Sequence, residues 1–167
     1  MIKDIIYFAK VKPDAIIPSK NEEDAGYDFY PNFESPQMII EPFTSRLIPT
    51  GVASAFVSDY VLLLAERGST GVKNMKRNAG VVDSGFRGEI QACIYNGNSK
   101  PVIITKEKDP AILEVLSEKY VVYPYTKAIC QGLLLILPKV TVVEKTLEDL
   151  RAIPSQRGKG MLGSSGK

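Results

Sequence analysis

Short runs of β-branched and aromatic residues recur along the whole chain, and proline and glycine residues separate them. In the run at 89–96, apolar and polar side chains partly alternate, as they do in a strand with one buried face. Regularly spaced short runs of this kind are typical of an all-β sandwich or barrel. We therefore predict strands within residues 5–11, 38–41, 45–56, 60–66, 79–82, 89–96, 100–105 and 128–144.

One stretch departs from the strand pattern and predicts a short helix over residues 110–119. Asp109 can cap the first turn, and Pro110 suits the first helical position. Apolar side chains then recur at helical spacing, at Ile112, Leu113, Val115 and Leu116. The helix would be inserted between two strands of an otherwise all-β chain.

The 167 residues, 44% of them hydrophobic and 24% charged, suit a single domain with one hydrophobic core. The net charge of +2 gives no reason to expect nucleic acid as a partner. No apolar run approaches the roughly 20 residues that span a bilayer, so we expect no membrane partner. Cys93 and Cys130 lie in apolar runs and are expected to be buried thiols, as in proteins of a reducing compartment.

The chain contains no histidine, and this absence restricts the chemistry that it can perform. A Ser-His-Asp triad, a Cys-His pair and an imidazole base are all excluded. If the protein performs acid–base chemistry, a carboxylate must carry it. If it binds a metal ion, the ion should be hard and oxygen-liganded, such as magnesium.

Three polar segments interrupt the hydrophobic pattern. In DAGYDFY, residues 24–30, two acids bracket a turn. ERGSTG, residues 66–71, follows a predicted strand and can present guanidinium, hydroxyl and backbone N–H donors to an anion. NAGVVDSGFRGEI, residues 78–90, predicts a tight hairpin. Each segment taken alone is also compatible with an ordinary polar turn or loop.

Asp83, at the tip of the predicted hairpin, is the candidate base. It follows an apolar run and precedes an aromatic residue, Phe86, so its carboxylate would stand beside an apolar surface. Arg87 is expected to be a structural partner of a nearby acid rather than a ligand contact. The hairpin is therefore the segment in which we expect the chemistry.

The C-terminal segment RGKGMLGSSGK, residues 157–167, has almost no side chain that could enter a core. It is not a P-loop, which lies between a strand and a helix. A frayed terminus is one interpretation. A phosphate clamp is the other, because the segment combines accessible backbone N–H groups with Arg157 and Lys159. We predict one β domain over residues 1–153 and a flexible glycine-rich arm over residues 154–167.

In their order along the chain, these segments and AICQGLLLILP, residues 128–138, resemble the five motifs of trimeric deoxyuridine triphosphatases, the dUTPase family. The resemblance implies an all-β fold, a distorted jelly-roll or β-clip barrel with one short helix, and a homotrimer that exchanges C-terminal arms. It also implies hydrolysis of dUTP to dUMP and pyrophosphate with magnesium. That reaction removes dUTP from the nucleotide pool and supplies dUMP for dTMP synthesis. The implied location is the cytoplasm, in a bacterium or a phage-infected host cell.

The resemblance implies roles for individual residues as well. Asp83 would orient and deprotonate the attacking water, and Asp28 would hold magnesium through a water molecule, with substrate phosphates as the other ligands. The phosphates would be bound by Arg67, Gly68, Ser69, Thr70, Gln131, Arg157, Gly163, Ser164 and Ser165. The uracil and the deoxyribose would be bound by Asn78, Gly80, Val81, Val82, Phe86 and Leu162.

Two departures from the family pattern concern the phosphates. Gly68 stands where a serine is usual, so either Ser69 or Thr70 could supply the hydroxyl that contacts phosphate. Ala128 stands where a basic residue is usual, and the adjacent Lys127 would substitute for it.

Other departures concern the base and an insert. Phe86 replaces the usual hairpin tyrosine and keeps its flat apolar face, and Leu162 replaces a phenylalanine that stacks on the base. Residues 106–127, the insert, are longer than the usual connection between the third and fourth motifs. The insert is either an extra packing element or, as in some phage members of the family, a surface for a protein partner.

Two other functions stay open at the level of sequence. A dCTP deaminase would share the fold and the trimer, and would release ammonia from dCTP instead of pyrophosphate from dUTP. The second alternative is a phage-type jelly-roll that mainly binds a protein and has reduced catalysis.

Overall fold

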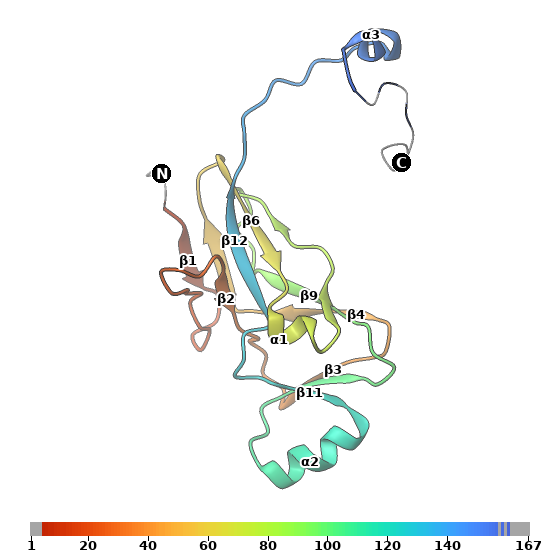
Figure 1. Ribbon diagram of the computed structural model, residues 1–167. Helices are drawn as coiled ribbons and strands as arrows, with labels where there is room; N and C mark the ends of the chain where they lie inside the picture. Colours follow the sequence, from red (N-terminus) through yellow and green to blue (C-terminus); the bar gives the residue numbers. More distant parts are fainter. Residues whose placement is uncertain (1–4, 157, 159, 161–167) are drawn as a thin grey trace. The chain divides into compact units, whose positions relative to one another are not determined.

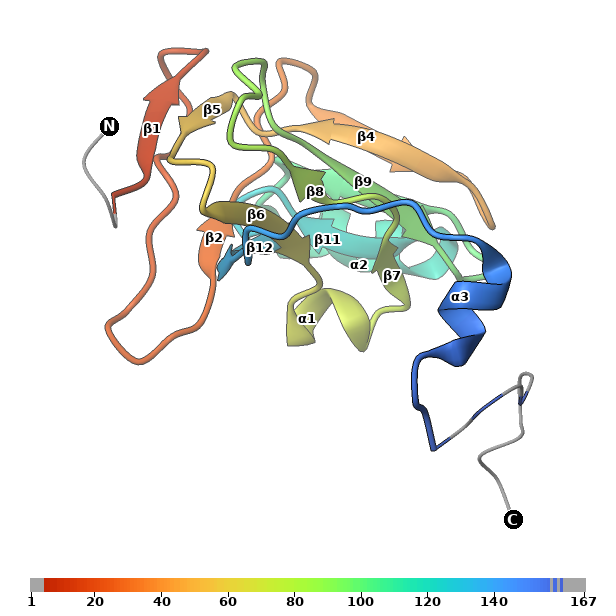
Figure 2. The same ribbon diagram turned by 90° about the horizontal axis from the view of Figure 1, so that it is seen from above.

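The structure, a computed structural model, describes residues 5–156, 158 and 160, and in this part of the chain twelve strands form four small open sheets (Figure 1). The four-stranded sheet has the order β2 (Tyr27–Phe29), β12 (Cys130–Ile136), β6 (Tyr60–Ala65) and β8 (Val81–Val82). The first three-stranded sheet has the order β4 (Ser45–Pro49), β9 (Gln91–Asn96) and β7 (Met75–Arg77). The second has the order β11 (Val121–Pro124), β10 (Val102–Thr105) and β3 (Gln37–Ile40), and β1 (Tyr7–Lys10) pairs with β5 (Val52–Ala55). The same elements are seen from above in Figure 2.

The mostly-β prediction is confirmed, with corrections at several elements. The predicted strand at 45–56 is wrong as one element, because Gly51 turns the chain with a φ of 68° between β4 and β5. The predicted strand at 128–144 is too long, since β12 ends at Ile136. Sequence analysis missed three short strands, β2, β7 and β11.

Three short helices occur in the described part of the chain where one was predicted. The predicted helix is confirmed as α2 (Pro110–Lys119), and the Asp109 carboxylate accepts a hydrogen bond from the Ala111 backbone N–H at 2.9 Å. The other two are α1 (Gly68–Gly71) and α3 (Leu147–Ala152). Both are too short to show the repeating apolar spacing that predicts a helix from sequence.

Two compact units share the chain, Met1–Leu137 and Pro138–Lys167. The first holds all the strands with α1 and α2, and the second holds α3. The first unit ends at Leu137, whereas the sequence prediction extended the β domain to residue 153. None of the described helices combines the length and the apolar character that crossing a membrane requires.

The core of the first unit is filled by the inward side chains of its sheets. Along β9, exposed or half-buried side chains alternate with the buried Ala92, Ile94 and Asn96, so this strand places one face in the core. The largest fully buried side chains are Tyr123, Phe29, Phe56, Ile40, Ile48, Leu62, Leu64, Met75, Ile90, Ile94, Ile103 and Ile104. Their burial makes the sheets a rigid support for the loops at their edges.

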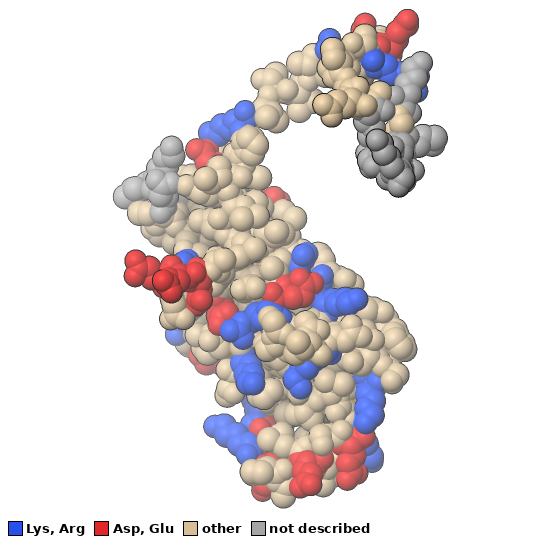
Figure 3. Space-filling model, viewed as in Figure 1, with Lys and Arg blue, Asp and Glu red and all other residues tan. Residues whose placement is uncertain are grey.

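The insert and the strand before it, β10, form a parallel β–α–β unit in a sheet that is otherwise antiparallel. β10 and β11 run parallel, with Tyr123 opposite Ile104, and α2 connects them. α2 has no buried residue, and acidic side chains gather over it and its flanking loops on the face in Figure 3. One interpretation of the insert was an extra packing element. The part of the insert that packs is mainly β11, whose Tyr123 side chain is buried in the core.

We expect Gly51→Ala to lower the free energy of unfolding by about 2 kcal/mol or more, because a left-handed φ is costly for any residue with a Cβ. A Cβ at this position would also stand 2.7 Å from the Ala15 Cβ and 2.9 Å from the Asn32 Oδ1. Chemical denaturation measures the change. Gly71→Ala is the matched control, because its Cβ would meet nothing within 4 Å. Equal stability of the two variants would contradict this account of the turn.

Candidate active site

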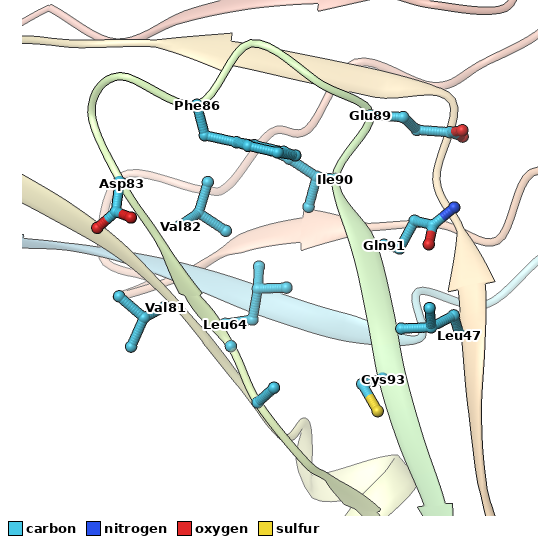
Figure 4. Close-up of a pocket in the computed structure, with 12 residues that line it drawn as sticks. Leu47, Leu64, Val81, Val82, Asp83, Phe86, Glu89, Ile90, Gln91 and Cys93 are labelled. Carbon is cyan, nitrogen blue, oxygen red and sulfur yellow. The ribbon is translucent and has the colours of Figure 1, made fainter.

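A cavity of about 260 Å³ opens between residues 79–83 and residues 89–93 (Figure 4). Its lining is mostly apolar and consists of Leu47, Leu64, Ala79, Gly80, Val81, Val82, Asp83, Phe86, Glu89, Ile90, Gln91 and Cys93. Since a cavity of about 150 Å³ holds benzene, this one has room for a single six-membered ring and part of a sugar. We call it the hairpin pocket.

The hairpin pocket exists because the two arms of the predicted hairpin separate. At the tip, the Phe86 N–H donates to the Asp83 carbonyl at 3.0 Å, which confirms the predicted tight turn. At the base, the Asn78 N–H donates to the Cys93 carbonyl at 2.8 Å. Between these closures β8 pairs with β6, and β9 pairs with β4 and β7. The two arms of the predicted tight hairpin therefore do not pair with each other, and the cavity lies between them.

Several residues predicted to contact the base and the sugar lie at this pocket. The Phe86 ring is 43% exposed and extends over the pocket above Ile90, while Val82 is buried beneath it (Figure 4). The Val81 side chain is 67% exposed, so only its backbone can serve a bound base. The Asn78 amide donates to the Ser45 hydroxyl at 2.9 Å and does not line the pocket.

Gly80 is required by close packing at the pocket wall. A Cβ on Gly80 would stand 2.5 Å from the Arg77 Cδ and 2.9 Å from the Leu64 carbonyl oxygen. The Gly80 carbonyl in turn accepts a hydrogen bond from the Leu64 N–H at 2.8 Å. The backbone at Gly80 is thus held between β6 and the Arg77 side chain.

Asp83 lies exposed at the mouth of the pocket, where the apolar lining ends (Figure 4). A second carboxylate at the pocket, Glu89, was missed by sequence analysis. Its Oε1 accepts a hydrogen bond from the Gly51 N–H at 2.6 Å, so this carboxylate holds the turn between β4 and β5. Of the two carboxylates, Asp83 is the one left accessible to a reacting group.

Two further expectations near the pocket need correction. Cys93 was expected to be buried, but it is only half-buried and lines the pocket. Cys130 is buried as expected, and burial raises the pKa of its thiol to about 12. Both are free thiols. Arg87 does not pair with an acid as expected. Its guanidinium donates to the carbonyls of Ser84 at 2.6 Å and Phe86 at 3.0 Å, which stabilises the turn that carries Asp83.

A second group of polar side chains, the phosphate cluster, consists of Asp28, Arg67, Ser69 and Gln131. Arg67 and Asp28 form a two-pronged ion pair, with Nε–Oδ1 at 2.8 Å and Nη2–Oδ2 at 3.0 Å. Gln131 lies opposite Asp28 in the β2–β12 register, and its amide donates to the Glu66 carbonyl at 2.7 Å. Arg67 and Asp28 are 31% and 27% exposed, so the cluster faces solvent and can receive an anion.

The geometry of α1 separates the roles of its two hydroxyl residues. The Thr70 hydroxyl accepts from the Arg67 N–H at 3.0 Å and donates to the Arg67 carbonyl at 2.9 Å, and Thr70 is 1% exposed. Thr70 therefore closes the turn and has no hydroxyl free for phosphate, contrary to its predicted role. The Ser69 hydroxyl lies 3.5 Å from the Arg67 Nη1 and is the one that can turn toward a ligand. A Cβ added at Gly68 would meet nothing within 4 Å, so the backbone there is open.

Tyr123, which sequence analysis did not select, lies beneath the phosphate cluster. Its ring is fully buried, and its hydroxyl donates to the Ala128 carbonyl at 2.6 Å. Burial raises the pKa of the Tyr123 hydroxyl, and the positive charge of Arg67 opposes the rise. Lys127, the expected substitute for a basic residue at Ala128, is exposed, and Ala128 is buried.

Along one chain, Asp83 at the mouth of the pocket and Arg67 of the phosphate cluster lie far apart. Val82 is opposite Leu62 in the β6–β8 ladder, so Asp83 lies near the start of β6, and Arg67 follows its end. At about 3.3 Å of rise per strand residue, the two side chains are separated by about 20 Å. Asp83 and Arg67 of the same chain are therefore too far apart to act on one phosphate group.

The remaining predicted contacts, Arg157, Leu162, Gly163, Ser164 and Ser165, lie outside the described residues. Within the described residues, no group of three or more aspartate, glutamate or cysteine side chains could hold a metal ion by itself.

A family model described as dUTPase matches residues 12–109 of the chain. Over 115 residues, 32% are identical to the Pol polyprotein of caprine arthritis encephalitis virus, a match that covers 69% of this chain and 10% of the polyprotein. Over 100 residues, 33% are identical to the deoxyuridine 5'-triphosphate nucleotidohydrolase of Mycolicibacterium gilvum, covering 57% of this chain and 63% of that enzyme. The chain thus spans less than two thirds of either relative.

The fold is also similar to solved structures of phage enzymes. A variant of the dUTPase of Staphylococcus bacteriophage 80alpha with dUpNHpp superposes with a TM-score of 0.70 at 20% identity, covering 99% of this chain and 100% of that one. A dUTPase variant from phage phi11 of S. aureus, described with a structural Mg(II) ion, gives a TM-score of 0.62 at 20% identity, covering 85% of this chain and 98% of that one. At these identities the likeness is one of fold.

Proposed function

The chain belongs to the dUTPase family, and from this premise we propose that it hydrolyses dUTP to dUMP and pyrophosphate. The observation that carries the proposal is the hairpin pocket, which has room for a pyrimidine ring and places one accessible carboxylate, Asp83, at its mouth. A base bound there would extend its sugar and phosphates past this carboxylate.

Asp83 is the general base of the proposed reaction. Its carboxylate takes a proton from a water molecule, whose oxygen attacks the phosphorus nearest the sugar, and the bond to the bridging oxygen breaks as pyrophosphate leaves. Phosphoanhydride hydrolysis depends mostly on positioning and on neutralising charge, so one carboxylate with a well-held substrate is sufficient. The absence of histidine from the chain is compatible with this mechanism.

The phosphate cluster supplies the charge neutralisation. Arg67 carries a guanidinium already oriented by Asp28, and Ser69 and Gln131 lie beside it as polar donors. Arg157, Gly163, Ser164 and Ser165 remain predicted phosphate contacts of the arm, and Leu162 remains the predicted cover of the base.

Magnesium is the proposed cofactor, and the donor chemistry of the cluster fits it. Magnesium keeps several water ligands and is usually held by one or two carboxylates together with substrate phosphates. Both Asp28 oxygens accept from Arg67, but a carboxylate oxygen has a second lone pair with which it can hold a metal-bound water. When bound, the ion would neutralise phosphate charge.

A homotrimer with sites shared between subunits is supported by the separation of about 20 Å between Asp83 and Arg67 within one chain. A triphosphate that extends past Asp83 would meet a phosphate cluster presented by a second copy. The exchanged C-terminal arm stays part of this proposal.

A hydrolysis assay tests the function directly. Purified protein should release pyrophosphate from dUTP in the presence of magnesium, and it should act far more slowly on dTTP and UTP. Loss of the reaction on chelation of magnesium, with recovery when magnesium is added back, is expected. Ammonia release from dCTP would favour the deaminase alternative, and the absence of any turnover would favour a protein-binding jelly-roll.

A second role, binding of a protein partner through the insert 106–127, is favoured by one observation. Ile112 and Val115 on α2 are 47% and 62% exposed, and acidic side chains lie over the α2 region on the face in Figure 3. This arrangement is compatible with a partner that has an apolar and basic surface. Co-purification with the full chain, but not with a chain lacking α2, would support this role.

A further inference from the structure

The wall of the hairpin pocket contains a strained residue, Ala79. Its backbone has a φ of 57°, a left-handed conformation that a residue with a Cβ rarely adopts. A strained backbone of this kind persists only where its surroundings hold it in place, and it is often part of a functional site. Because Ala79 lines the pocket, the contacts that hold it also fix the shape of the wall.

Hydrogen bonds of the backbone fix the chain on both sides of Ala79. On one side, the Asn78 N–H donates to the Cys93 carbonyl at 2.8 Å. On the other side, the Gly80 carbonyl accepts from the Leu64 N–H at 2.8 Å. These bonds attach the wall to β9 and to β6, and a side chain supports the wall from a third direction.

Arg77 is the residue that supplies this third support. An ideal Cβ on Gly80 would stand 2.5 Å from the Arg77 Cδ and 2.8 Å from its Nη1, so the Arg77 side chain lies against the Gly80 backbone. Arg77 does not line the pocket and therefore supports the wall from behind. Within the described part of the chain, its Nε is buried and has no hydrogen-bond partner. A buried N–H without a partner costs free energy, and its retention here is explained if the side chain is needed behind the wall.

Glu66 holds the strand that carries Arg77. Arg77 is the last residue of β7, and its backbone N–H donates to the Glu66 Oε1 at 3.0 Å. Glu66 directly follows β6, so this bond joins the end of β7 to the strand with which the pocket wall pairs. The Glu66 carbonyl in turn accepts from the Gln131 amide at 2.7 Å. Arg77 is therefore held at its backbone while its side chain lies against Gly80.

We propose that Arg77 is a positioning residue of the hairpin pocket, where its side chain holds Ala79 and Gly80 in the conformation that receives the base. This inference rests on the proposed dUTP hydrolysis. Without the side chain, Ala79 would relax out of the left-handed region, and the substrate would have to restore the wall when it binds. The strain of one such residue corresponds to about a tenfold change in an equilibrium constant, so affinity for the base should fall by about that factor.

The test is Arg77→Ala, which removes the support behind Gly80. We expect KM for dUTP and the Kd of deoxyuridine, measured by calorimetry, to rise together by about tenfold, with kcat within about twofold of the wild-type value. The Kd of pyrophosphate, which has no base, should not change. Lys76→Ala is the matched control and should leave these constants unchanged, because Lys76 is exposed and adjacent side chains of a strand point to opposite faces.

Two further variants separate positioning from charge and from general destabilisation. Arg77→Met keeps a long stem behind Gly80 without the guanidinium, and it should bind deoxyuridine within about twofold of the wild-type Kd. If it binds as weakly as Arg77→Ala, packing is not the cause and the proposal is overturned. Ala79→Gly, added to Arg77→Ala, should restore most of the affinity, because glycine adopts a left-handed φ without strain.

Thermal melts check that each variant is folded. If Arg77→Ala does not fold, Glu66→Ala provides the test, since it removes the acceptor of the Arg77 backbone N–H. Glu66→Ala should weaken the binding of deoxyuridine and leave the binding of pyrophosphate unchanged. Wild-type affinity for deoxyuridine in this variant would overturn the proposal.

The outcomes distinguish this proposal from the proposed function. If the wild-type protein neither hydrolyses dUTP nor binds deoxyuridine, the proposed function fails, and this inference fails with it. If it binds deoxyuridine without hydrolysing dUTP, the proposed function fails while the Kd values still test the role of Arg77. If Arg77→Ala matches an active wild-type protein in KM and Kd, only the role of Arg77 is overturned. Equal weakening of deoxyuridine and pyrophosphate binding would also overturn it, because that result indicates a general loss of structure.

Discussion

Replacement of Asp83 with asparagine should lower kcat for dUTP by about 10²–10⁴, the usual contribution of a general base. Asparagine has nearly the same shape but cannot accept a proton from water. Asp83 lies at the mouth of the pocket and its side chain is exposed, so we expect KM to stay within about twofold of the wild-type value. Steady-state kinetics of pyrophosphate release measure both quantities.

Asp24→Asn is the matched control for this substitution. Asp24 is an exposed aspartate whose carboxylate accepts hydrogen bonds from the backbone and the side chain of Asn21, at 3.2 and 2.7 Å. Its loss should leave turnover unchanged. If Asp83→Asn kept near-normal kcat, another group would have to activate the water, and the assignment of the base would be wrong.

The elements that sequence analysis predicted well are those with local signals. α2 was predicted over its full length because its cap at Asp109, Pro110 and its apolar spacing all lie within one segment. β6 and β9 were found because each is a dense run of strand-forming residues bounded by turn residues. The turn at Asp83 was recognised from its own residues.

What the sequence did not predict depends on contacts between distant segments. The hairpin pocket forms because β8 pairs with β6 rather than with β9, and no local pattern specifies that choice. The Thr70 hydroxyl is not free to contact phosphate as predicted, because it is buried and hydrogen-bonded to the Arg67 backbone. Tyr123 was not selected because only the fold brings it to the segment that leads into β12, where its hydroxyl donates to the Ala128 carbonyl.

Mixing two inactive variants, Asp83→Asn and Arg67→Met, should restore dUTP hydrolysis. The two side chains are about 20 Å apart within one chain, so each proposed site combines Asp83 of one copy with Arg67 of another. In trimers assembled at random from equal amounts of the two variants, about a quarter of the sites would have both groups intact. We therefore expect about a quarter of the wild-type activity after joint denaturation and refolding, where each variant refolded alone has almost none.

The control for this recovery is a mixture of Asp83→Asn with Asp83→Ala, in which every site lacks the same carboxylate. That mixture should stay inactive, because no assembly of these chains can supply the base. Mass spectrometry of the intact assemblies verifies that mixed trimers have formed. Mixed trimers without recovered activity would place both groups of a working site in one chain, and the shared-site arrangement would then be excluded. If activity returns only in the first mixture, a working site must combine groups of two chains, because neither variant alone contains both groups.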